Sequence, residues 1–314
     1  MSKRIVLPVS SSSRNRPRFE KLLQSPPTFH RLTGLTPAQF HTLAAAVEPL
    51  FWEDDAQRRA ARPNRKRKTG AGKKLELSVP EILFMTLLYY RTYITHVFVG
   101  FLMDIDDGNV WIYFKRMEPV LARVFKMPER RMDMTQDEVW ELIVDATEQR
   151  SNRSKGSGYS GKKKAHTLKT QFIVGRNRHI KSLSKTVPGQ RSDKKLYDRT
   201  KAYVTADSIT NHNKAGPPPR LTDSGYVGVP GAVLPEKKKR KKKGEPKDKL
   251  NKEQKKWNKL LGSNRVVVEH IFSFSGIKKY QIIRDRYRNP VHRYAVTIKN
   301  IAGLHNFVLD NPSG

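Results

Sequence analysis

The sequence predicts an α+β protein in which a helical first part is followed by a part built on β-strands. Apolar residues recur at helical spacing between residues 35 and 125, whereas short apolar and alternating runs, typical of strands, follow Met134. The 314 residues suffice for two domains, and a hydrophobic content of 37% is enough for a folded core. We therefore expect a flexible basic arm over residues 1–30, a helical domain over 31–130 and a strand-rich domain over 135–314.

Four helices are predicted in the first part, over residues 35–51, 79–93, 95–103 and 109–125. The first helix has Thr36 as its N-cap and Gln39 three residues later, which is the spacing of a capping box. Asp107 is expected to cap the fourth helix, and Pro119 should kink or interrupt it. A short helix, a turn and a longer helix form the layout of a helix-turn-helix module, but a plain helical bundle with a basic surface explains the same pattern.

The second part combines strands with helices. The predicted strands cover residues 137–145, 165–175 and 179–187, with a short strand and turn within 220–231. Short basic loops join the first three strands, which favours an antiparallel meander. The predicted helices cover residues 193–203, 263–280 and 290–309. A charge block over 236–259 is expected to be a surface excursion, and a basic insertion is assigned to about 232–262.

Positive charge dominates the chain, because 62 Lys and Arg residues stand against 29 Asp and Glu residues, a formal net charge of +33. Such a surplus favours nucleic acid or an anionic membrane surface as the partner. The sequence has no run of 18 or more apolar residues and lacks the apolar core of a secretory signal. It also has no cysteine, which excludes disulfides, thiolate zinc sites and cysteine nucleophiles.

Four acidic residues stand at informative positions in this basic chain. Asp145 follows an apolar strand, Asp193 follows the third predicted strand, Asp223 precedes a glycine beside a short strand, and Glu269 lies on a largely apolar helix. Converging carboxylates repel one another unless divalent cations lie between them, and hard oxygen ligands suit Mg²⁺ or Mn²⁺. Two such ions, about 3.5–4 Å apart, can activate a water or a 3′-hydroxyl for attack on a phosphodiester.

Each acid also has an ordinary structural explanation. Asp193 can cap the helix that starts after it, Asp223 can stabilise a turn, and Glu269 can pair with Arg265 one helical turn earlier. Asp145 can act as a cap or pair with an arginine that follows it in the chain. Each explanation suffices for its own residue. None explains why the acids occur along the chain at the end of one strand, at the end of another strand and then on a helix.

Four stretches of the sequence resemble one family. They are IVDATEQ (143–149), YSGKKKAHTLKTQFIV (159–174), LTDSGYVG (221–228) and NRVVVEHIFSFSGIKKY (264–280). They are similar to the strands and the helix that carry the acids of DDE-type insertion-sequence transposases, in the insertion-sequence-five group and its Harbinger-like relatives. The helical region 32–125 resembles the helix-turn-helix domain that precedes the nuclease in that family. Ser192 departs from the family pattern, which often has His before its intermediate Asp.

The resemblance implies an RNase H-like nuclease domain, a mixed sheet flanked by helices, over residues 135–314. In such a fold the strand of Asp145 is central, Asp223 ends an adjacent strand, and the helix of Glu269 packs across the sheet. By this likeness Asp145, Asp223 and Glu269 are the catalytic residues and bind two Mg²⁺ or Mn²⁺ ions. Asp193 is expected to be an auxiliary metal ligand.

DNA contacts are expected from basic residues near the acids and from the longer helix of the helix-turn-helix. The lysines before and within the second strand can bind phosphates beside the cut site, although a solvated basic turn is the alternative. The predicted DNA-binding residues are Lys162, Lys163, Lys164, Lys169, Arg265, Lys278, Lys279, Lys115 and Arg116. The role of His166 stays open.

The resulting hypothesis is a DNA transposase that binds terminal inverted repeats, cleaves the ends and transfers the strands. Its expected partner is double-stranded DNA, both transposon ends and target, bound by a homodimer, with no role for a membrane. The expected location is the cytoplasm and nucleoid of a prokaryote or the nucleus of a eukaryote. Two alternatives stay open: a catalytically inactive or repurposed sequence-specific DNA-binding protein, and a basic RNA- or ribosome-associated protein that leaves the acids unexplained.

Overall fold

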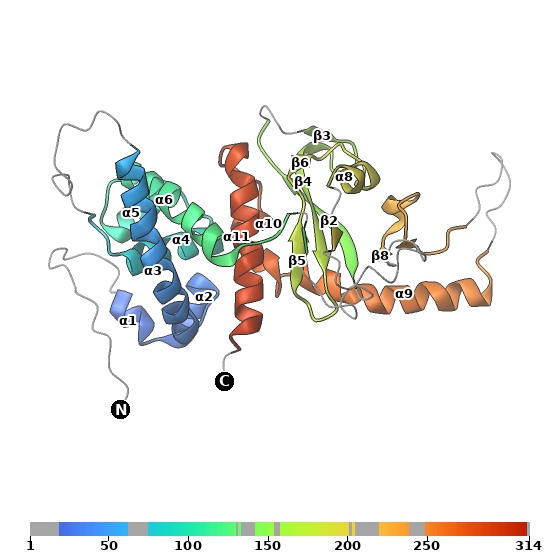
Figure 1. Ribbon diagram of the computed structural model, residues 1–314, viewed down its shortest axis with the longest axis horizontal. Helices are drawn as coiled ribbons and strands as arrows, with labels where there is room; N and C mark the ends of the chain where they lie inside the picture. Colours follow the sequence, from blue (N-terminus) through green and yellow to red (C-terminus); the bar gives the residue numbers. More distant parts are fainter. Residues whose placement is uncertain are drawn as a thin grey trace. The chain divides into compact units, whose positions relative to one another are not determined.

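The computed structural model describes residues 19–61, 75–129, 131–132, 142–153, 158–200, 203–204, 220–238 and 249–312 (Figure 1). The chain folds as two compact units. The first comprises Met1–Lys126 with Tyr280–Ile282 and Asp310–Gly314, and the second comprises Met127–Lys279 with Ile283–Leu309. Parts of three predicted features lie outside the described residues: the arm over 1–18, the start of the first strand over 137–141, and the basic run over 239–243.

The helices of the first unit include the four predicted ones, the first of which runs nine residues past its predicted end at residue 51. Their bounds are α1 Phe19–Leu23, α2 Pro26–Thr33, α3 Pro37–Ala60, α4 Val79–Thr92, α5 His96–Met103 and α6 Asp107–Phe125. One correction concerns the predicted arm, whose second part forms α1 and α2. The reason is aromatic burial, because Phe29 is fully buried with its ring 5.2 Å from that of Phe40 and 5.8 Å from that of Phe84.

Local sequence signals fix the ends of these helices. At the start of α3, Thr36 accepts a hydrogen bond from the Gln39 amide, and the Gln39 side chain accepts one from the Thr36 amide, so the predicted capping box is confirmed. The cap of α6 is Asp106, which accepts from the Gly108 amide at 2.8 Å. The prediction of an interruption at Pro119 is wrong. This residue lies on the exposed face of α6, where water can satisfy the carbonyl that proline leaves without a partner.

Helix α4 is the centre of the first unit. Every residue from Val79 to Tyr90 except Glu81 is buried, which is typical of a helix surrounded by other helices. The Tyr89 ring stacks on that of Phe114 at 4.5 Å, and this contact joins α4 to α6. The turn between α5 and α6 is tight, because a Cβ on Gly100 would lie 2.7 Å from the Ile105 carbonyl oxygen. The layout of short helix, turn and longer helix is therefore present as predicted.

A buried acid joins α3 to α6. Asp55 is 4% exposed and pairs with Arg116 at 2.5 Å, with Arg59 at 2.5 Å and with Arg58. Burial raises the pKa of Asp55, but the Arg58 hydrogen bond and the three arginine charges outweigh it, so this pKa lies below its usual value. Arg116 is 12% exposed and lies 4.8 Å from the Phe51 ring. Its guanidinium therefore serves the packing of the unit, in contrast to the DNA contact predicted for Arg116 from the sequence.

The second unit is built on a mixed sheet with the strand order β3-β4-β2-β8-β9 (Figure 1). The bounds are β2 Ile143–Arg150, β3 Gly158–Ser160, β4 Ala165–Val174, β5 Ile180–Leu183, β6 Val187–Pro188, β8 Arg220–Thr222 and β9 Ala232–Val233. Strand β4 pairs antiparallel with β2, β3, β5 and β6, whereas β8 pairs parallel with β2 and β9. The predicted meander is confirmed for the antiparallel strands. A separate parallel pair joins β1 Arg131–Met132 to β7 Tyr203–Val204.

Helices flank this sheet. Their bounds are α8 Asp193–Thr200, α9 Lys252–Ile271, α10 Gln281–Arg284 and α11 Val291–Asp310, with short 3-10 helices η1 Ser224–Tyr226 and η2 Ile277–Lys279. Leu142, Val144 and Tyr226 pack together in the core on one face of the sheet. Helix α9 contacts β2 and β8, and the ring of Phe272 lies 5.0 Å from that of Phe172 on β4. The α+β prediction is confirmed, with the strand of Asp145 in the centre of the sheet.

The predicted basic insertion over 232–262 needs correction. Its first residues form the edge strand β9, and residues 252–262 are the first half of α9, continuous with the helix predicted over 263–280. Helix α9 begins early because Asn251 and Gln254 form a reciprocal capping box, with a distance of 2.7 Å from the Gln254 amide to Asn251 Oδ1. It ends at Ile271, nine residues before the predicted end. The charge block therefore contributes a helix to the fold.

The Asp55 cluster leads to a stability prediction. Asp55→Ala should lower the free energy of unfolding by about 3–5 kcal/mol, because it leaves the buried Arg116 without a counter-charge. Arg58→Ala should cost at most about 1 kcal/mol, since Arg58 is 42% exposed. Urea denaturation of the two variants measures the difference. Equal losses would mean that Asp55 and Arg116 do not form the main ion pair of this cluster.

Candidate active site

Strand pairing brings Asp145 and Asp223 together. Strands β2 and β8 run parallel with Ile143 opposite Leu221 and Val144 opposite Thr222, so the two aspartates come next in register. Strand β8 ends at Thr222, and Asp223 then caps η1 by accepting from the Gly225 amide at 2.8 Å. The prediction that Asp145 ends its strand is wrong, because β2 continues to Arg150 in pairing with β4. The neighbouring strand β8 is the one that ends beside Asp145, and its end leaves one side of Asp145 without a paired strand.

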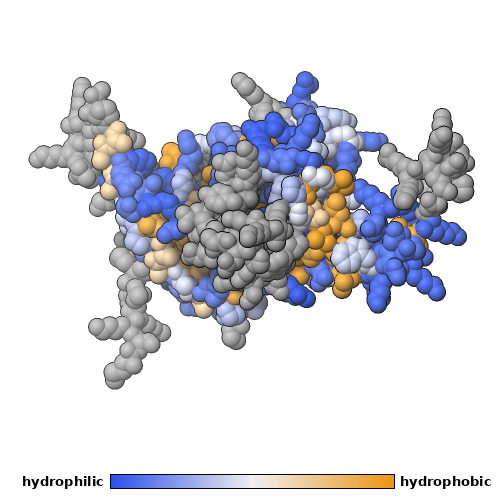
Figure 2. Space-filling view, turned by 45° about the vertical axis from the view of Figure 1, so that its right-hand side comes forward, coloured by the Kyte–Doolittle hydropathy of each residue, from blue (hydrophilic) through white to orange (hydrophobic). Residues whose placement is uncertain are grey.

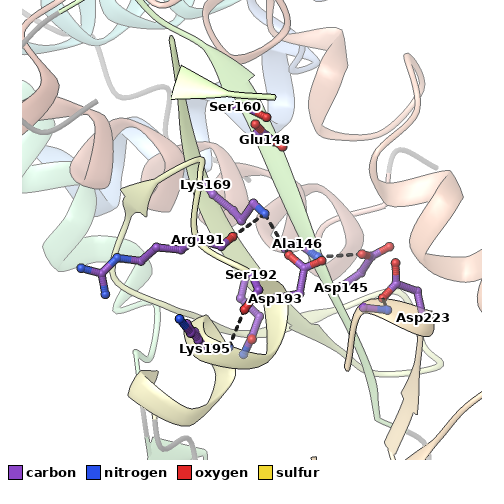
Figure 3. A network of polar contacts seen from close by, with 12 residues as sticks. Asp145, Ala146, Glu148, Ser160, Lys169, Arg191, Ser192, Asp193, Lys195 and Asp223 are labelled. Carbon is purple, nitrogen blue, oxygen red and sulfur yellow. Dashed lines mark hydrogen bonds and ion pairs between the residues drawn. The ribbon is translucent and has the colours of Figure 1, made fainter. Parts of the chain in front are cut away.

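Asp193 joins these two acids from helix α8, of which it is the first residue. Asp193 and Asp223 approach each other at Gly225. A Cβ on this glycine would lie 2.6 Å from Asp193 Oδ2 and 3.0 Å from Asp223 Oδ1. Figure 3 shows the side chains of Asp145, Asp193 and Asp223 gathered in this region. We call these three residues the acid cluster. A side chain at position 225 would fill the space between two of its carboxylates.

Two cations of the same unit lie against the acid cluster, and Figure 3 shows one of them, Lys169. Arg265 of α9 is 3.2 Å from Asp145 Oδ2, and Lys169 of β4 is 3.1 Å from Asp193 Oδ1. Lys169 also donates to the Arg191 carbonyl at 2.8 Å, which holds its ammonium group in place. Lys169 is 11% exposed and Arg265 is 19% exposed. Both residues were predicted to bind DNA, but in this structure their charges lie against carboxylates.

The pKa of Asp145 reflects its burial first and then the charged groups around it. Burial raises it most, the Ala146 amide and Arg265 lower it, and the charges of Asp223 and Asp193 raise it, with a net shift above its usual value. The Tyr226 hydroxyl lies in the same field. Burial and then the three carboxylates raise the pKa of Tyr226 far above its usual value. Within the described residues this buried hydroxyl has no hydrogen-bond partner.

Glu269 is the predicted acid that lies on helix α9. It is on the exposed side of α9, one helical turn beyond Arg265, which is the residue of this helix that contacts Asp145. The charged groups that shift the pKa of Asp145 are Arg265, Asp223 and Asp193. Of the four predicted acids, the structure thus gathers Asp145, Asp193 and Asp223. The order of the chain alone did not show that Asp193, predicted as auxiliary, would lie near enough to affect the pKa of Asp145.

The other predicted DNA-binding residues fall into two groups. Lys162, Lys163 and Lys164 are exposed in the turn between β3 and β4. The side chain of Lys115 is exposed on α6, with its ammonium 5.8 Å from the centre of the Trp111 ring. These four lysines are accessible. The side chains of Lys278 and Lys279, within η2, are half-buried.

The carboxylates of the acid cluster are chemically suited to a divalent metal, but their arrangement in this structure is not that of a metal site. Carboxylate oxygens of Asp193 and Asp223 approach the same point beside Gly225, and such hard donors suit Mg²⁺ or Mn²⁺. Across the described part of the chain, no group of three or more His, Asp or Glu side chains has the geometry to hold a metal ion as it stands. Lys169 and Arg265 are the cations that offset Asp193 and Asp145 in this arrangement.

Two features of this site were missed from the sequence. One is the counter-ion role of Lys169 and Arg265, which lie 24 and 120 residues away from their partners. The other is Tyr226, three residues after Asp223, whose ring is buried beneath the cluster. The spacing D-x-x-Y is a signal that could have indicated a short turn returning to the core.

Among the residues that the structure describes, no helix is long and apolar enough to cross a membrane.

Asp223 is predicted to destabilise the fold through its charge. Asp223→Asn keeps an oxygen for the Gly225 amide but removes repulsion from Asp145, so it should raise the Tm of the metal-free protein by about 2–4 °C at neutral pH. Asp223→Ala, which also removes the cap, should lack this gain. Because the pKa of Asp145 is raised, its protonation on acidification relieves the repulsion in wild type. The advantage of Asp223→Asn should therefore shrink as pH falls through that pKa, which thermal unfolding from pH 8 to pH 4 would measure; a constant advantage would contradict this account.

Comparison with known proteins identifies the family. Residues 144–306 match the family described as DDE superfamily endonuclease, and residues 75–126 match the helix-turn-helix of DDE superfamily endonuclease. The probable transposase for insertion sequence element IS702 of Microchaete diplosiphon is 26% identical to this chain over 288 residues, covering 90% of this chain and 94% of the relative. No solved structure matches the chain.

These matches coincide with the two parts of the structure. The match over 75–126 covers α4, α5 and α6, and favours a helix-turn-helix over a plain helical bundle. The match over 144–306 spans more than half of the chain and includes the whole acid cluster. The helix-turn-helix precedes the part of the chain that carries the acid cluster, and both parts match models of one family. The chain belongs to the DDE superfamily endonucleases.

Proposed function

We propose that this protein is a DNA transposase that cleaves DNA at the acid cluster. The observation that carries this proposal is the convergence of Asp145, Asp193 and Asp223 from three different elements, next to one another in spite of their repulsion. Asp145 and Asp193 each have a cation partner, but three carboxylates still share one small region, and such concentrations of titratable groups are typical of functional sites. The printed name of the relative, a probable transposase, supports the same function.

The acid cluster is proposed to hold two Mg²⁺ or Mn²⁺ ions. Asp145 and Asp223 would provide ligands from the sheet, Asp193 from α8, and Glu269 from α9. When bound there, these ions supply the charge that activates a water or a 3′-hydroxyl and stabilises the leaving oxygen. Asp145 is held rigidly because β2 stays paired with β4 at this position and beyond it, which fixes its carboxylate better than a loop would.

The basic residues divide into two proposed roles. Lys169 and Arg265 keep the carboxylates of Asp193 and Asp145 in place and offset their charge before metal binds. The exposed lysines 162–164 contact DNA phosphates near the cut site. The helix-turn-helix, with Lys115 on its longer helix, binds the terminal inverted repeats. Pairing of two ends for strand transfer requires at least two copies of the chain, so we propose a homodimer on DNA.

The second candidate function is a DNA-binding protein without nuclease activity. It is favoured by the ion pairs of Lys169 and Arg265, which already offset two of the three acids, and by the position of Glu269 outside the cluster. Both functions share the DNA partner. They differ in whether divalent metal displaces the two cations from the carboxylates.

Metal binding can be tested without any catalytic readout. Mn²⁺ at about 100 times its Kd should stabilise the wild-type protein by about 2.7 kcal/mol, seen as a rise in Tm. Asp193→Asn should lose most of this rise. Asp198→Asn, which removes an exposed acid from the same helix α8, should keep it. A rise that is equal in all three proteins would assign the metal to another place.

Cleavage tests the proposed activity. Purified protein, Mn²⁺ and a duplex carrying the ends of the element that encodes this chain should yield cleaved ends. Asp145→Ala should lower the rate by about 10³-fold or more while DNA binding is retained. Asp198→Ala should cleave like wild type, and Glu269→Gln tests the contribution of α9 separately. Binding without cleavage by the wild-type protein would support the second candidate function instead.

A further inference from the structure

The first half of α9 carries a row of lysines that the acid cluster does not use. They stand at the spacing i, i+3, i+4, i+7, which places them on one face of a helix. All four are exposed, and they are Lys252, Lys255, Lys256 and Lys259. We call them the lysine row. In Figure 2 the first half of α9, at the right of the view as in Figure 1, has a largely hydrophilic surface.

Helix α9 links the lysine row to the acid cluster as one continuous rod. Its second half packs on the sheet through Leu261, Val268 and Ile271 and brings Arg265 to Asp145. At a rise of about 1.5 Å per residue, the row lies roughly 9–20 Å from Arg265 along the helix axis. The distance between the lysines and the acids is therefore set by an uninterrupted helix instead of a loop.

Hydrogen bonds attach the first half of α9 to the segment that follows β9. The Trp257 indole donates to the Leu234 carbonyl at 3.4 Å. Asn258 accepts from the Glu236 amide at 2.8 Å and donates to the Glu236 carbonyl at 3.0 Å. In the same segment Lys237 donates to the Ser224 carbonyl at 3.1 Å, directly after Asp223 in the chain. These contacts keep the lysine row in a fixed position relative to the acid cluster.

We propose that the lysine row binds the phosphate backbone of the DNA duplex on one side of the cleavage point, so that α9 sets the length of duplex between them. This inference rests on the proposed function. The row is about 10 Å long, which corresponds to about three base-pair steps at 3.4 Å each. Its distance from Arg265 corresponds to phosphates about three to six nucleotides from the cut. Four lysines in a row on a rigid helix match a regular polyanion, and a DNA duplex is the regular polyanion of the proposed function.

The test compares two double variants that each remove two positive charges. Lys255→Gln with Lys259→Gln alters the lysine row. Lys185→Gln with Arg199→Gln removes two exposed charges elsewhere in the same unit. Binding to the end duplex is measured without divalent metal across a range of salt concentrations. The row variant should lower the slope of log K against log salt by about 1.8, because each lost phosphate contact lowers it by about 0.9.

Phosphate-ethylation interference on the same duplex locates the contacts. In wild type, ethylation about three to six nucleotides from the cut should weaken binding, and this interference should disappear in the row variant but remain in the control variant. Equal loss of slope in both variants, or interference confined to other phosphates, would overturn the inference. Binding of the row to duplex RNA, with no interference on DNA, would overturn it as well.

Failure of this inference and failure of the proposed function give different results. If wild type and Asp145→Ala cleave equally, the proposed nuclease site is wrong even where the phosphate contacts of the row are found. If cleavage depends on Asp145 but the row variant keeps its slope and its interference pattern, only the role of α9 is wrong.

Discussion

Repulsion among three carboxylates is the constraint on which the second unit depends. The parallel register of β2 and β8 sets Asp145 beside Asp223, and α8 adds Asp193. Burial contributes most to the raised pKa of Asp145, and the nearby charges of Asp223 and Asp193 add to it. The surrounding structure compensates with Arg265 and Lys169, each supplied by a different element. Sheet, helices and counter-ions together hold an arrangement that the acids alone would not adopt.

Three carboxylates close together lower the stability of the metal-free fold, and we propose that they are kept there for metal binding. The metal-free protein is predicted to gain stability when Asp223 is neutralised, because its charge lies near that of Asp145. Losing Asp145 or Asp193 would instead leave a cation without its carboxylate. Gly225 keeps the space between Asp193 and Asp223 open, where any side chain would fill it. The ion pairs with Lys169 and Arg265 offset charge but are partly exposed, so they can be exchanged for another cation. We propose that such a site is stable enough to fold and can exchange these cations for a divalent ion.

Charge elsewhere in the chain serves two separate purposes. In the first unit, three arginines converge on the buried Asp55, and Arg116 becomes part of the packing between α3 and α6. In the second unit, lysines stay in the solvent on the turn at 162–164 and on the first half of α9. Burial decides between these purposes, since a buried cation needs a carboxylate whereas an exposed one is available to a phosphate.

The sequence by itself determined the features that arise from neighbouring residues. Capping boxes, apolar periodicity and the family motifs predicted the helices, the antiparallel strands and the identity of the acids. Tertiary structure alone decided which acids meet, because the register of β8 against β2 and the start of α8 depend on contacts across many residues. It gathered Asp193 with Asp145 and Asp223, left Glu269 on an exposed face, and turned Lys169 and Arg265 toward carboxylates. Local signals carry no information about such distant pairings, and they are what form the site.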